Sequence, residues 1–149
     1  MIYQQTEEAC DYLLEKAKEY HIDVKWKHFS PTTPPGSSYE YRRVIMNLDW
    51  HRPEELIFQL AHELAHVIHG DTGDVVFYHA SFTGKESVEY KANVGAVELL
   101  VPFYCQGTEI QCVNSANFMQ AFHVPHYLAS VVSEEIKEYY AKLLIYVQA

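Results

Sequence analysis

The chain has 149 residues, of which 48% are hydrophobic and 21% are charged, a balance typical of one globular domain with its own core. A net charge of −9 with only 11 lysines and arginines argues against direct nucleic acid binding, which needs clustered cations. No apolar run could cross a bilayer, the first residues lack a signal-peptide pattern, and three cysteines without close spacing favour reduced thiols. We therefore expect a single cytoplasmic domain over residues 1–149 that does not associate with a membrane.

The first third of the chain predicts one helix and two strands. Residues 6–20 carry an apolar stripe at helical spacing: Ala9, Leu13, Ala17 and Tyr20. Residues 22–26 and 41–48 alternate apolar and polar side chains, the period of half-buried strands. Residues 30–38 between them are rich in Pro, Thr, Gly and Ser, as in a surface loop. The two strands could pair as a hairpin with a long connection, which gives a small antiparallel sheet.

Residues 53–70 predict a helix of about four or five turns. Pro53 suits the first turn, where its missing N–H costs nothing, and Gly70 is typical of a helix end. The apolar positions between them keep helical spacing: Leu56, Leu60, Leu64, Val67 and Ile68.

The rest of the chain predicts a loop and further helices. Residues 71–84 read as a loop that could contain a strand, and residues 86–101 predict a strong helix that Pro102 closes. Residues 103–113 read as irregular. Two helices follow, at 115–122 and at about 125–147.

A metal-binding pattern lies near the end of the helix predicted over residues 53–70. His62 and His66 are four residues apart, so both imidazoles project from one face of the helix and could bind one tetrahedral Zn²⁺. Glu63 lies about 100° around the helix, where it could reach a water on the metal and act as general base. The alternative is two histidines that pack on a helix face without a metal.

A catalytic zinc site usually needs a third protein ligand. A histidine six residues beyond His66 is absent because position 72 is Thr72. Glu86 and Glu89, near the start of the next predicted helix, are candidates, and Glu89 shares a stripe with Asn93. Four residues nearer the motif remain possible further ligands: His69, Asp71, Asp74 and His79. A fourth protein ligand at His69 would leave no open position on the metal and make the site structural.

Two segments together resemble the ImmA/IrrE metallopeptidases. Residues 60–70 read LAHELAHVIHG, which resembles the family's metal-binding signature. Residues 89–102 read EYKANVGAVELLVP, which resembles its Glu-x-x-Ala-Asn-x-x-Ala-x-x-Leu-Leu-x-Pro segment. One departure is Gly95, which costs helix stability relative to Ala and suggests close packing under the site.

The resemblance implies an α+β, zincin-like fold in which a small sheet packs beside the active-site helix, with C-terminal helices. It implies that His62, His66 and Glu89 bind zinc, that Glu63 is the catalytic base, and that His69 is not a ligand. The donor that stabilises the oxyanion stays open among Tyr78, His79 and Tyr90. Family members cleave DNA-binding repressors, so a helix-turn-helix repressor is the expected substrate.

Residues 114–149 resemble the family's helix-turn-helix-like tail. Its expected core is Phe118, Phe122, Val124, Tyr127, Leu128 and Val131. Such a tail could dock the repressor or gate the site, or it could simply pack. Two other functions stay open for the whole chain: an anti-repressor with structural zinc that binds its target without cutting it, and an α-rich module without metal.

Overall fold

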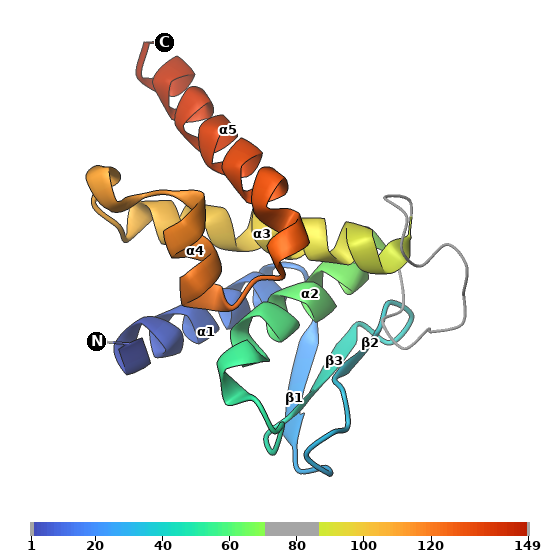
Figure 1. The fold of residues 1–149 in the computed structure, drawn as a ribbon. Coiled ribbons are helices and arrows are strands. Elements are labelled where there is room, and N and C mark those ends of the chain that lie inside the picture. The colour runs from blue at the N-terminus through green and yellow to red at the C-terminus, as the bar shows by residue number, and fades with distance from the viewer. Residues whose placement is uncertain (1, 71–86, 149) are drawn as a thin grey trace.

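The computed structural model describes residues 2–70 and 87–148, which form an α+β fold (Figure 1). The helices are α1 (Ile2–Glu19), α2 (Leu56–His69), α3 (Val88–Gln106), α4 (Ser115–Phe122) and α5 (Ala129–Gln148). The strands are β1 (Asp23–Lys27), β2 (Gly36–Ser38) and β3 (Arg43–Asn47). Helix α2 lies at the centre, with the sheet on one side and α3 on the other. None of the described helices combines the length and the apolar character of a membrane span.

The sheet is mixed, with the strand order β1-β3-β2. The α+β class is confirmed, but the prediction that the two long strands form an antiparallel hairpin is wrong, because β1 and β3 pair in parallel. The antiparallel hairpin consists of β2 and β3, with Ser37 opposite Val44. Strand β2 lies inside residues 30–38, which we expected to be a loop. After β1 the chain forms β2 at the far edge of the sheet, and it then returns to form β3 between the two.

One buried side chain organises the connection between β1 and β2. Asn47, at the end of β3, is 1% exposed, and its amide N–H groups donate to the carbonyl oxygens of Ser30 and Thr33 at 2.7 and 3.0 Å. Its side-chain oxygen accepts from the backbone N–H groups of Phe29 and Asp49 at 3.2 and 2.9 Å. All the hydrogen-bonding groups of the Asn47 side chain are thus satisfied without water. These bonds hold the β1–β2 connection in the position from which β2 can pair with β3.

Helix α2 forms as its sequence predicts. A short 3₁₀ turn, Pro53–Glu55, precedes it, and Gly70 ends it in the left-handed conformation with φ of +88°, which glycine adopts at little cost. Its apolar side of Leu60, Leu64 and Val67 is completely buried. Burial of this helix on both sides fixes its rotation about its own axis, and therefore the direction in which His62 and His66 point.

Helix α3 continues past Pro102, so the prediction that this proline closes the helix is wrong. A proline inside a helix removes one backbone hydrogen bond and costs about 3 kcal/mol. Buried side chains on both sides of it, Val101 and Tyr104, offset that cost by packing in the core. Beside the proline, the carbonyl oxygen of Leu99 accepts a hydrogen bond from the Tyr12 hydroxyl of α1 at 2.8 Å.

The C-terminal helices pack on α3 through an aromatic cluster. Phe118, Phe122 and Tyr104 contact one another edge to face, at centroid separations of 5.0 to 6.3 Å. The expected tail core is only partly correct: Phe118, Phe122, Val124 and Leu128 are buried, but Tyr127 is 61% exposed. Past this cluster, α5 extends away from the rest of the molecule (Figure 1), and its last turns carry exposed apolar side chains.

Candidate metal centre

Two of the candidate ligands lie on the central helix α2. His66 is completely buried, and His62 is partly exposed. Their rings meet edge to face with centroids 4.6 Å apart, as the four-residue spacing predicts. Their Nε2 atoms are 3.1 Å apart, so both rings present the same nitrogen to one point in space.

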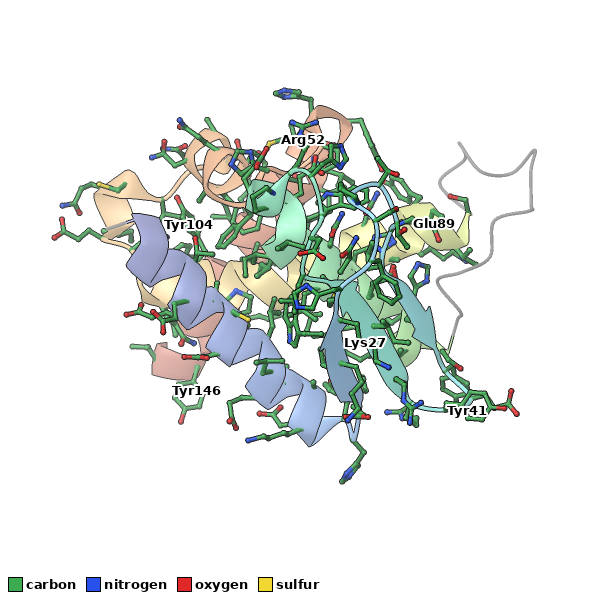
Figure 2. The ribbon with its side chains drawn as sticks, turned by 90° about the horizontal axis from the view of Figure 1, so that it is seen from below. Lys27, Tyr41, Arg52, Glu89, Tyr104 and Tyr146 are labelled. Carbon is green, nitrogen blue, oxygen red and sulfur yellow. The ribbon has the colours of Figure 1, made fainter. Side chains whose placement is uncertain are left out.

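The third candidate ligand comes from the first turn of α3. Ser87 caps this helix, and its side-chain oxygen accepts the backbone N–H of Tyr90 at 3.0 Å. Such a cap fixes where a helix begins, and so it places Glu89 in the first turn, where it faces α2. Figure 2 shows Glu89 at this end of α3.

Close approach of the two helices brings Glu89 to the histidines. Gly95 lies where α3 crosses α2, and a Cβ atom there would be 2.7 Å from Cβ of Ala65 and 2.9 Å from Cε1 of His69. Only glycine fits at that separation, so the expectation that Gly95 allows close packing under the site is confirmed. The same contact places the His69 ring against α3.

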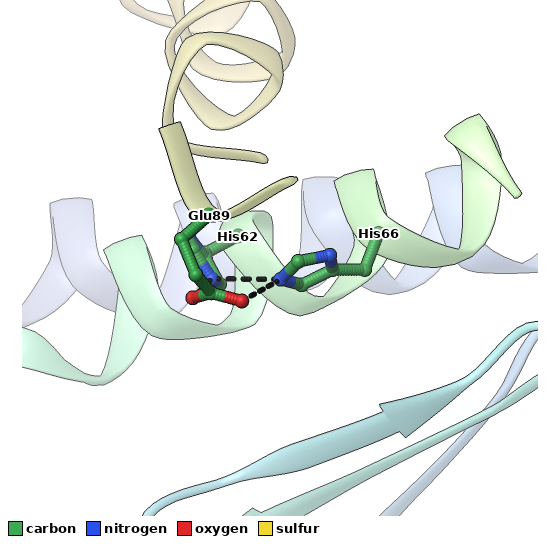
Figure 3. Close-up of side chains that lie close together, drawn as sticks. All are labelled: His62, His66 and Glu89. Carbon is green, nitrogen blue, oxygen red and sulfur yellow. Dashed lines mark hydrogen bonds and ion pairs between the residues drawn. The ribbon is translucent and has the colours of Figure 1, made fainter. Parts of the chain in front are cut away.

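The three donor atoms have the spacing of a metal site (Figure 3). The carboxylate of Glu89 lies 3.1 Å from His62 Nε2 and 3.0 Å from His66 Nε2. Donors about 2.0–2.1 Å from a tetrahedral zinc ion lie about 3.3 Å from one another, so a small outward adjustment would admit an ion. Among the described residues, His62, His66 and Glu89 form a group that could hold a metal ion. Two imidazoles and one carboxylate suit zinc.

Electrostatics in the group favour a charged carboxylate beside the histidines. Burial acts to raise the pKa of Glu89, but hydrogen bonds and charge from His62 and His66 lower that pKa to about 2. Burial acts to lower the pKa of His62, but its hydrogen bond to Glu89 and the charges of Glu63 and Glu89 raise that pKa above the ordinary histidine value. Without a metal, His62 therefore tends to carry the positive charge that an ion would otherwise supply.

Glu63 lies beside this group, beneath β2. The side chain is 3% exposed, and its Oε2 atom has no hydrogen-bond partner among the described groups. Burial raises the pKa of Glu63, while the charge of His62 and a hydrogen bond from Ser37 act to lower it. A buried carboxyl group with a free oxygen and a raised pKa, next to a metal-binding group, has the properties of a proton acceptor.

A second layer of hydrogen bonds holds His62. Its Nδ1 atom lies 2.6 Å from Oδ1 of Asn93, one turn after Glu89 on α3. The Asn93 amide in turn donates to the hydroxyl of Tyr127, in the 3₁₀ turn His126–Leu128 between α4 and α5. The ring of Tyr127 stacks on that of Tyr90, with centroids 6.3 Å apart.

The remaining candidates from the sequence fall into two groups. His69 packs against Gly95 and is not part of the metal-binding group, and Tyr90 stacks on Tyr127. The others lie outside the described residues: Asp71, Asp74, Tyr78, His79 and Glu86.

Three residues at the site were not identified as such from the sequence. Asn93 follows Glu89 by four positions, so the shared helix face was an available signal. Ser37 lies in a stretch that reads as a loop, and Tyr127 is 34 residues from Asn93. No local pattern connects either of these two to the metal-binding motif.

Comparison with known proteins places more than half of the chain in one family. A family model described as Peptidase M78, IrrE N-terminal-like domain, matches residues 17–103. The matched segment contains α2, the first sixteen residues of α3 and all three candidate ligands. No curated protein and no solved structure matches the chain.

Proposed function

The chain belongs to the peptidase family of IrrE N-terminal-like domains, and from this premise we propose that it is a zinc-dependent endopeptidase. The observation that carries the proposal is the convergence of His62 Nε2, His66 Nε2 and the Glu89 carboxylate within 3.1 Å, next to the buried carboxyl group of Glu63. In this proposal the first three residues hold zinc, and Glu63 is the general base.

The chemistry divides between the ion and the protein. Zinc held here would lower the pKa of a bound water to about 7 and polarise the scissile carbonyl. In this proposal the Glu63 carboxylate would accept a proton from the attacking water and pass it to the leaving amine nitrogen. Burial raises the pKa of the Glu63 carboxyl group above its ordinary value, and a higher pKa makes the carboxylate a better proton acceptor.

We propose a helix-turn-helix repressor as the substrate, cleaved in the cytoplasm. The support comes from the resemblance to the repressor-cleaving metallopeptidases and from charge. A chain with a net charge of −9 attracts a basic protein, and a DNA-binding surface is basic. The tail, residues 114–149, is the part that we expect to contact the repressor, because α5 extends away from the rest of the molecule (Figure 1) and its last turns expose apolar side chains.

The variant Glu63→Gln tests the assignment of the base. The amide keeps the size of the side chain but cannot accept the proton, so cleavage of the repressor should fall at least about 100-fold while zinc content is unchanged. Glu40→Gln, an exposed residue of the β2–β3 turn, is the matched control and should cleave normally. Gel analysis of a timed digest gives the rate. Normal cleavage by Glu63→Gln would show that Glu63 is not the base.

The same digest separates the peptidase from a non-proteolytic anti-repressor. An anti-repressor with structural zinc would bind the repressor and release it from DNA while leaving its length unchanged. The acidic charge of the chain is compatible with this second function. Release from DNA with the repressor intact would favour it over the peptidase.

A further inference from the structure

A chain of hydrogen bonds leads from the metal-binding group to the C-terminal tail. His62 Nδ1 contacts Asn93 Oδ1 at 2.6 Å, and Asn93 Nδ2 donates to the Tyr127 hydroxyl. Tyr127 lies outside the matched residues 17–103. The tail therefore contributes a side chain to the surroundings of His62.

Metal binding would fix the direction of every bond in this chain. His62 Nε2 faces Glu89 and His66, so a metal ligand role needs its lone pair on Nε2 and its proton on Nδ1. The Nδ1–H group must then meet an acceptor, which is Oδ1 of Asn93. The other end of the amide is a donor, and the oxygen of Tyr127 accepts from it.

The position of Tyr127 is itself well held. Leu128, the next residue, is completely buried, which anchors the turn that carries the tyrosine. The ring stacks on Tyr90 of α3 at an angle of 28°. Although Tyr127 is 61% exposed, the buried neighbour Leu128 and the stacked ring of Tyr90 therefore hold its hydroxyl in place.

We propose that Tyr127 is a positioning residue for the metal ligand His62, acting through Asn93. The inference rests on the proposed function, because it assigns the role relative to zinc held by His62. An asparagine amide turns easily about its last torsion angle, and Tyr127 holds the end that does not contact the histidine. Without the hydroxyl, the amide can turn away from Nδ1 and leave the imidazole free to rotate.

The variant Tyr127→Phe removes the hydroxyl and keeps the ring that stacks on Tyr90. Loss of a residue that orients a metal ligand typically lowers metal affinity 10- to 100-fold, and we expect about 10-fold, because Tyr127 acts through a second residue. Tyr41→Phe is the matched control: Tyr41 is 72% exposed and points away from the body of the protein (Figure 2). Its zinc affinity should equal that of the wild type.

The measurement is the zinc dissociation constant of the purified full chain, from competition with a chelator at a temperature where every variant is folded. In the zinc-loaded protein, exchange of the His62 Nδ1–H proton with water, followed by NMR, gives a second readout that does not depend on activity. We expect faster exchange in Tyr127→Phe. Unchanged affinity and unchanged exchange would overturn the inference.

A second background tests the role of the amide. With Asn93→Asp, both carboxylate oxygens accept, so Nδ1–H meets an acceptor in either orientation. Adding Tyr127→Phe there should change zinc affinity less than threefold, and an equal loss in both backgrounds would overturn the inference. If the wild type binds no zinc, both the proposed function and this inference fail. If the wild type binds zinc and Tyr127→Phe binds it equally well, only this inference fails.

Discussion

Two side chains of the site, His62 and Glu89, belong to different helices and lie 3.1 Å apart, and each changes the pKa of the other. Glu89 has a pKa of about 2, and His62 has a pKa above its ordinary value. A proton on His62 and a zinc ion on the same group therefore compete. The thermal stability of the metal-free protein should therefore fall as the pH rises, whereas the stabilisation that zinc adds should grow as the pH rises.

The metal-free protein should lose thermal stability between pH 6 and pH 8. The lowered pKa of Glu89 stabilises the fold above about pH 4.3, and this is lost as the pH falls toward 2. The raised pKa of His62 stabilises the fold below about pH 6.5, and this is lost as the pH rises through its folded value. The raised pKa of Glu63 acts in the same direction as that of His62.

Thermal unfolding in chelator, followed by circular dichroism, checks this dependence. The fall in Tm from pH 6 to pH 8 should be smaller in Glu89→Gln, which removes the charge that raises the pKa of His62. With excess zinc the gain in Tm should instead grow with pH, because the ion binds neutral imidazole. An equal fall in Glu89→Gln and the wild type would contradict the account of this pair.

The sequence predicted the convergence of His62 and His66 because four residues on one helix face is a local property. The proximity of Glu89 to the histidines depends on how α3 crosses α2. Residue spacing in the sequence alone did not distinguish Glu89 from Glu86 and the other candidate ligands. Tyr127 was expected in the tail core from the resemblance to the family's tail. Its exposure and its contact with Asn93 depend on how the turn His126–Leu128 meets α3, which no local pattern encodes.

At the scale of elements, the contact between α2 and α3 sets the geometry of the centre. Gly95 and Ala65 meet at a distance that leaves no room for another methyl group. The helices can approach this closely because both residues are small and Ala65 is buried. Any increase in their separation moves Glu89 away from His66.

The variant Gly95→Ala should therefore lower both stability and zinc affinity. Overpacking typically costs about 2 kcal/mol, and better helix propensity returns about 1 kcal/mol, so a net loss of about 1 kcal/mol is expected in urea unfolding of the metal-free protein. Gly36→Ala is the control, since nothing lies within 4 Å of an added Cβ there; its stability should be unchanged or slightly higher. A Gly95→Ala protein with wild-type stability would show that the contact is looser than described.

The elements themselves were predictable to the extent that their patterns are local. Helix α2 carries its apolar period in its own residues, with a proline in the 3₁₀ turn before it and a glycine directly after it. Strand β2 has only the residues Gly36, Ser37 and Ser38, and its pairing depends on β3 and on the loop held by Asn47. Helix α3 passes Pro102 because core packing outweighs a local penalty.

At the scale of the whole molecule, the metal-binding group joins two layers of the fold. Helix α2 packs against the sheet on one side and against α3 on the other. Ligands from α2 and α3 would let an ion hold these layers together, while hydrogen bonds through Asn93 extend the connection to the turn before α5. The family match covers the layers that carry the three candidate ligands, and Tyr127 of the tail lies beyond it.

The central claim is that His62, His66 and Glu89 together bind one zinc ion, and the zinc content of the purified chain tests it most directly. Elemental analysis after dialysis against zinc-free buffer should find about one zinc per wild-type chain. Glu89→Ala, which removes one of three protein ligands, should retain far less under the same conditions. A wild-type chain without zinc, or a Glu89→Ala chain with the wild-type amount, would contradict the account.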